Sequence, residues 1–72
     1  MKKWPKAGTQ NDKIFRYMIG NGAITPLKAL EVAGCFRLSE RCREIEALGW
    51  KIVRERVRTS GGAQVMSYRL EN

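Results

Sequence analysis

The chain has 72 residues, of which 14 are Lys or Arg and 7 are Asp or Glu, so its net charge at neutral pH is +7. This length allows one domain with a small hydrophobic core and leaves no room for a catalytic cleft with its own supporting residues. The sequence contains no histidine, no glycine-rich phosphate loop and no nucleophile beside a base, so we expect no enzymatic activity. A basic excess of this kind favours a polyanionic partner, with nucleic acid before an anionic membrane.

The cysteine content and the first residues limit the class of protein further. Two cysteines without histidine cannot form a four-ligand zinc site, so we expect no metal and no cofactor. Cys35 and Cys42 are predicted to be small buried hydrophobic residues rather than a disulfide. The start of the chain carries charge but no apolar run, which predicts neither a signal peptide nor a membrane span. We therefore expect a reduced, cytoplasmic protein without a membrane partner.

The positive charge lies at the two ends of the chain. Residues 1–16 and residues 50–70 each carry a net charge of +4, whereas residues 17–49 are neutral. Residues 1–10, here called the arm, show no periodicity and are interpreted as flexible, which leaves residues 11–72 as the folded domain. Trp4 either folds back onto this domain or contacts a partner, and the sequence leaves both options open.

The first two predicted helices are marked by their ends. The first begins at one of three capping residues, Thr9, Asn11 or Asp12, and ends at Gly20 to Gly22. Ala23 and Ile24 form an extended link, with a short third strand beside the later hairpin as one option. The second helix has a hydroxyl cap followed by proline, Thr25-Pro26, and closes at Gly34. Its apolar face is predicted to consist of Leu27, Leu30 and Ala33.

The third predicted helix covers residues 37–48 and ends before Gly49. One apolar stripe at helical spacing is expected to face the core, formed by Leu38, Cys42, Ile45 and Leu48. The opposite face presents Glu40, Arg43 and Ala47, flanked by Ser39 and Glu44. Arg37 and Arg41 are expected on the shoulder nearer the core.

A β-hairpin is predicted to follow. Residues 50–58 are rich in β-branched and aromatic residues, residues 59–63 supply a turn, and residues 64–70 return. In the returning strand Met66, Tyr68 and Leu70 should face the core, while Val65, Ser67 and Arg69 should face outwards. The predicted fold class is therefore α+β, a winged helix-turn-helix in which three helices are followed by a β-hairpin wing.

The sequence also resembles a known family. The segments I-T-P-L-K-A-L, C-F-R-L-S-E-R, G-W-K-I and Y-R-L occur in an order similar to that in small helix-turn-helix proteins encoded by phages and prophages. The resemblance extends over residues 14–70 and implies a winged helix that binds DNA inside a bacterial host cell. One difference is visible, because Glu40, Glu44 and Glu46 make the third helix electrically neutral.

These features predict a double-stranded DNA-binding regulator or accessory factor, acting as a monomer or weak homodimer. Arg43 and Ser39 are predicted to meet base edges, and Glu40 could accept a hydrogen bond from cytosine. The alternative is a solvated charge lattice in which Glu40 pairs with Arg43 and Arg43 pairs with Glu46. The full set of predicted DNA-binding residues is Thr25, Lys28, Arg37, Ser39, Glu40, Arg41, Arg43, Arg54, Arg56, Arg58 and Ser60.

The arginines of the hairpin and the cap of the second helix have alternative roles as well. Arg54, Arg56 and Arg58 recur at every second position, so one strand face would carry three guanidinium groups for phosphates or a minor groove. They could instead protect an edge strand from aggregation. Thr25, reinforced by Lys28, could hold a phosphate at a helix N-terminus, although capping alone explains the threonine.

A second function was weighed against DNA binding. A winged helix can serve as a protein-interaction module, for example as a phage product that binds and modulates a host nucleic-acid enzyme. The neutral third helix favours this alternative, and the basic arm and hairpin favour DNA.

Overall fold

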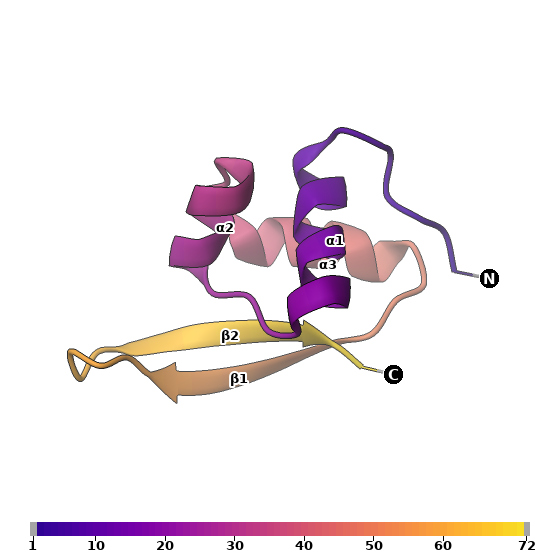
Figure 1. Ribbon diagram of the computed structural model, residues 1–72. Coiled ribbons are helices and arrows are strands. Elements are labelled where there is room, and N and C mark those ends of the chain that lie inside the picture. Colours follow the sequence, from indigo (N-terminus) through magenta and orange to yellow (C-terminus); the bar gives the residue numbers. More distant parts are fainter. Residues whose placement is uncertain (1, 72) are drawn as a thin grey trace.

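Three helices precede a two-stranded antiparallel hairpin in the computed structural model, which describes residues 2–71 (Figure 1). The elements are α1 (Gln10–Asn21), α2 (Pro26–Ala33), α3 (Leu38–Ala47), β1 (Ile52–Arg58) and β2 (Gln64–Leu70). The three helices lie on one side of the hairpin, which extends beyond them at its tip (Figure 1). The β1–β2 hairpin is the wing, and the predicted order of elements is confirmed.

The ends of α1 and α2 depend on local chemistry. Thr9 Oγ1 accepts a hydrogen bond from the Asp12 amide at 3.2 Å, and Thr25 Oγ1 accepts one from the Lys28 amide at 3.3 Å. These bonds satisfy amides that have no partner inside the helix. Gly34 ends α2 with φ at +61°, in the left-handed region where a side chain is disfavoured.

The core lies where α1 and α3 meet each other and the base of the hairpin. The predicted apolar stripe of α3 is confirmed at Leu38, Cys42 and Ile45, which are buried, whereas Leu48 lies just after the helix and is only partly buried. Both cysteines are buried, and burial raises the pKa of the Cys42 thiol to about 12, which keeps it protonated. The other buried apolar residues are Ile14, Phe15, Met18, Ile24, Ala29, Ile52 and Tyr68.

The apolar face of α2 differs from the prediction. Ala29 is the buried residue of this helix, whereas Leu27 is 68% exposed and Leu30 is 39% exposed. Apolar residues occur on more than one side of this eight-residue helix, so their spacing does not determine which side faces the core. The small Ala29 side chain lets the α2 backbone approach its neighbours closely.

A third chain segment pairs with the wing. The Ile24 amide donates to the Tyr68 carbonyl at 2.7 Å, and the Tyr68 amide donates to the Ile24 carbonyl at 2.9 Å. The link between α1 and α2 therefore lies beside the hairpin, as one option predicted, but in the described part of the chain it forms a single bridge and the sheet has two strands. The bridge fixes the base of β2 against the helices.

The two faces of the wing follow the pairing of its strands. Arg54 is paired with Tyr68 in the register, and their common face packs on the helices at the base of the hairpin. Ser67 on the other face is buried, which corrects the prediction that it points to solvent. Its cross-strand partner Glu55 forms an ion pair with Arg69 at 3.0 Å on the same face.

Candidate nucleic-acid interface

The face of α3 opposite the core is open to solvent. Glu40, Arg43, Glu44 and Ala47 line a shallow depression on it. Arg43 is exposed, and no acidic side chain of residues 2–71 forms an ion pair with it. Its guanidinium group therefore retains its donors for an external acceptor.

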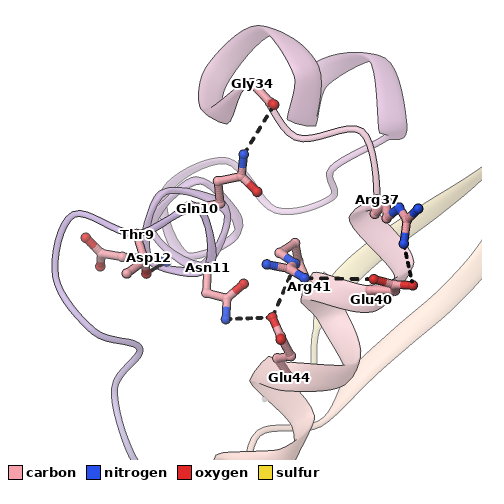
Figure 2. Close-up of polar contacts among 9 residues, drawn as sticks. All are labelled: Thr9, Gln10, Asn11, Asp12, Gly34, Arg37, Glu40, Arg41 and Glu44. Carbon is pink, nitrogen blue, oxygen red and sulfur yellow. Dashed lines mark hydrogen bonds and ion pairs between the residues drawn. The ribbon is translucent and has the colours of Figure 1, made fainter.

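The glutamates of α3 pair with other cations than Arg43. Glu40 forms ion pairs with Arg37 at 3.4 Å and with Arg41 at 3.9 Å (Figure 2). Glu46 is held by Arg54 of β1. Neither Glu40 nor Glu46 forms an ion pair with Arg43, although the positive charge of Arg43 also contributes to lowering the pKa of Glu46.

Arg41 belongs to the side of α3 that faces α1. Its Nε atom lies 3.2 Å from Glu44 Oε1, and this carboxylate accepts a hydrogen bond from Asn11 Nδ2 at 3.0 Å (Figure 2). Gln10 Nε2 donates to the Gly34 carbonyl at 3.3 Å (Figure 2). These contacts join α1 to α3 and to the end of α2, so the structure places Arg41 in a bridge between helices.

Arg54 connects the wing to α3. Its two terminal nitrogens donate to Glu46 at 3.0 and 2.6 Å, in the two-bond geometry that planar guanidinium and carboxylate groups favour. These bonds hold the pKa of Glu46 below its usual value and raise the pKa of Arg54. The Arg54 guanidinium also lies 5.7 Å from the centre of the Tyr68 ring. Arg54 thereby contacts both α3 and the aromatic ring of its cross-strand neighbour.

The outer half of the wing carries unpaired positive charge. Arg56 and Arg58 share a strand face with Arg54, are exposed and form no ion pair with any acid of residues 2–71. Ser60 is exposed in the turn at the tip. The repulsion expected among three arginines on one face is reduced, because Glu46 neutralises the innermost one.

The remaining predicted site residues lie at the starts of α2 and α3. Thr25 caps α2, and Lys28 Nζ lies 3.1 Å from Glu31, which raises the pKa of Lys28. Arg37 is the residue before α3, and Ser39 is exposed in the first turn of that helix. Thr25 and Lys28 are partly exposed at the start of α2, and Arg37 and Ser39 are exposed at the start of α3.

Two features of the interface were not found from the sequence. Glu46 was noted only as part of a neutral helix, yet it anchors the wing through Arg54. Phe36 is 86% exposed in the turn before α3, beside Arg37. A bulky aromatic residue in a turn gives no periodic signal from which exposure could be predicted.

Trp4 folds back onto the domain. Its ring packs edge-on against Phe15, with centroids 4.6 Å apart, and its Nε1 donates to Asp12 at 3.3 Å. The first of the two options for Trp4 is therefore met, and the residue remains 52% exposed.

Within residues 2–71, no helix is both long enough and apolar enough to cross a membrane. In the same part of the chain, no three His, Cys, Asp or Glu side chains gather where they could hold a metal ion.

Comparison with known proteins identifies the domain. No curated protein and no solved structure matches the chain. A family model described as a winged helix-turn-helix domain matches residues 9–72. The match runs from the cap of α1 through the helices and the whole wing. The chain therefore belongs to the winged helix-turn-helix domain family.

Proposed function

We propose that this protein is a non-enzymatic DNA-binding protein that places α3 in the major groove of duplex DNA and sets the wing on the adjacent backbone. The family supports DNA as the partner. The observation that carries the proposal is a set of exposed cations that have no ion-pair partner within residues 2–71, on the face of α3 and the outer wing, namely Arg43, Arg56 and Arg58. An uncompensated guanidinium group on a groove-sized helix suits bidentate contact with guanine.

The residues divide into three roles under this proposal. Arg43 and Ser39 read base edges, while Glu40 remains bound to its neighbouring arginines. Arg56 and Arg58 contact phosphates, with Ser60 at the tip beside them. Thr25, Lys28 and Arg37 contact the backbone near the helix N-termini, and Arg41 and Arg54 position the elements. The resemblance to phage-encoded proteins supports a regulator or accessory factor in a phage or prophage setting.

A second candidate function is binding to a protein. It is favoured by the exposure of Leu27 and Phe36, on α2 and in the turn before α3. Large apolar side chains left in solvent are typical of protein interfaces. The partner in this case would be an acidic host protein that meets the basic wing.

Salt dependence of duplex binding tests the proposed function. A mobility-shift titration on random-sequence duplex should give a slope of log K against log salt of about −4 to −6, because roughly five to seven phosphates are neutralised. A slope shallower than about −2 would contradict phosphate-driven binding and favour the protein partner.

Two substitutions separate base reading from backbone contact. Arg43→Ala should cost about 1–3 kcal/mol on a site selected from a random library and little on random duplex. Arg56→Ala should weaken binding to both and reduce the salt slope by about one. Equal loss on both duplexes in both variants would show that α3 does not read sequence.

A further inference from the structure

We propose that the arm is a second phosphate-binding flank of the interface, held along α3 on the side opposite the wing, so that α3 lies between two basic surfaces. This inference rests on the proposed DNA binding and adds a contact surface to it. Its ligand is the sugar–phosphate backbone of duplex DNA.

The backbone of the arm is bonded to the end of α3. The Lys3 amide donates to the Leu48 carbonyl at 2.8 Å, and Trp50 Nε1 donates to the Lys3 carbonyl at 2.7 Å. Lys2 Nζ lies 5.0 Å from the centre of the Trp50 ring, within the range of a cation–π contact. Lys2 and Lys3 are therefore located beside the C-terminal end of α3.

An aromatic cluster holds the same segment. The ring of Phe15 lies between the two tryptophans, with its centroid 4.6 Å from Trp4 and 4.7 Å from Trp50. Asp12 accepts hydrogen bonds from Trp4 Nε1 at 3.3 Å and from the Gly8 amide at 3.0 Å. Packing and hydrogen bonds thus fix both ends of residues 4–8 against α1.

The arm and the wing lie on different sides of α3. Pro5 and Lys6 line a shallow depression together with Glu44 and Leu48, on the side of α3 that faces α1. Arg54 of the wing is bonded to Glu46. Glu46 follows Glu44 by two residues and therefore lies about 200° around the helix from it. The exposed face with Arg43 lies between these flanks. Figure 1 shows the arm descending beside the C-terminal end of α3 while the wing tip extends past the other end.

The charges of the arm are available to a ligand. Lys2, Lys3 and Lys6 are exposed, and none forms an ion pair with an acid of residues 2–71. Asp12, the nearest acid in sequence, is already bonded to Arg16 at 2.9 Å. A segment that is already docked loses less conformational entropy when it binds a ligand than a free segment does, and this difference favours affinity. A purely structural role is the alternative, because cations near a helix C-terminus compensate its dipole.

Lys6→Gln tests the flank, and Lys13→Gln is its matched control. Lys13 is also exposed and unpaired within residues 2–71, but it lies on the side of α1 away from the buried Ile14 and Phe15. On random-sequence duplex, Lys6→Gln should reduce the salt slope by about 0.9 and weaken binding about five-fold at 0.15 M salt, by loss of one phosphate contact. Lys13→Gln should leave the slope unchanged.

Trp4→Ala tests whether the arm must be docked. This variant keeps every lysine, and Trp4 is half exposed, so the fold should persist. Trp50 is the only tryptophan left in this variant and it contacts the arm, so the emission wavelength of Trp50 reports release of the arm. Trp4→Phe also leaves Trp50 as the only tryptophan and retains an aromatic ring against Phe15, so it is the reference. We expect the Trp50 emission of Trp4→Ala to be shifted to longer wavelength than that of Trp4→Phe, and its binding to be several-fold weaker.

The outcomes separate the two proposals. If the wild type binds duplex with a steep salt dependence and Lys6→Gln and Lys13→Gln have equal salt slopes, the proposal of a second flank is overturned and the proposed function remains intact. A lower thermal midpoint in Lys6→Gln with unchanged binding would overturn it in favour of dipole compensation. Unchanged binding by Trp4→Ala despite a fluorescence change would show that docking of the arm is not required. Absence of duplex binding by the wild type would refute both proposals.

Discussion

At the scale of single residues, Asp12 joins the start of α1 to the chain before it. The amide of Gly8 and the side chains of Arg16 and Trp4 all donate to its carboxylate. The Gly8 hydrogen bond, followed by the Arg16 contact, holds the pKa of Asp12 below its usual value of 3.8 against the opposing effect of burial. The folded state therefore favours the ionised form of the Asp12 carboxyl.

The lowered pKa of Asp12 predicts how stability depends on pH. A carboxyl whose pKa is lower in the folded state than in the unfolded state stabilises the fold. This contribution is complete at pH values above the unfolded pKa and is lost as the pH falls through the folded pKa. We expect Asp12→Asn to melt at a lower temperature than the wild type at pH 7, with the difference shrinking below pH 3.8. Thermal unfolding monitored by circular dichroism from pH 7 to pH 2 measures this. A difference that is constant over the whole range would contradict the role of the charge.

At the scale of elements, Arg54 and Glu46 form a side-chain link between the wing and α3, in addition to the backbone bridge and the apolar core that hold the base of the wing. Both Arg54 and Glu46 are about one third exposed, so solvent weakens their attraction and a coupling energy of about 0.5–1 kcal/mol is expected. Arg54 shares its strand face with Arg56 and Arg58, so Glu46 neutralises one of the three cations on that face of the wing.

Removing the carboxylate of Glu46 should strengthen binding to duplex DNA. Glu46→Gln releases Arg54 toward phosphate and raises the net charge by one, so we expect a gain of a few-fold at 0.15 M salt and a slope steeper by up to about 0.9. Glu55→Gln is the control, since it makes the same change in charge at an ion pair with Arg69 on the other face of the wing. Equal gains from both variants would show that net charge alone acts, and that Arg54 has no directed contact.

At the scale of the whole molecule, a small core supports every element. Ile45 of α3 is fully buried among residues from α1, and a domain of this size is stabilised by only about 4–10 kcal/mol in total. The wing contributes Ile52 and Tyr68 to this core, and the arm packs against Phe15 of the core through Trp4, so the positions of both depend on it. Loss of packing at α3 should therefore release both flanks of the interface together.

A substitution in the core should show this dependence. Ile45→Ala is expected to lower the free energy of unfolding by about 2–4 kcal/mol, because it removes buried methyl groups and leaves a cavity. Ser39→Ala on the exposed side of the same helix should change it by less than about 0.5 kcal/mol. Urea unfolding followed by circular dichroism gives both values. Similar losses in the two variants would mean that α3 is rotated relative to the structure described.

The sequence alone determined the order and the ends of the elements. Thr9 and Thr25 begin helices and Gly34 ends one through contacts within a few residues of each. Such local contacts can be predicted without knowledge of the tertiary structure. The buried stripe of α3 was also predicted, because a ten-residue helix with apolar residues along one side has a single face to bury. The exposure of Arg43 followed from that same stripe.

Only the tertiary structure decided which partners distant residues take. Ala29 rather than Leu27 faces the core, since the packing of a short helix depends on the surfaces around it. Arg54 finds Glu46 on another element, and the Trp50 side chain is bonded to a backbone carbonyl 47 residues away at Lys3. Periodicity records the face of one element and carries no information about its neighbours. The positions of the arm and the wing on either side of α3 could therefore be determined only from the tertiary structure.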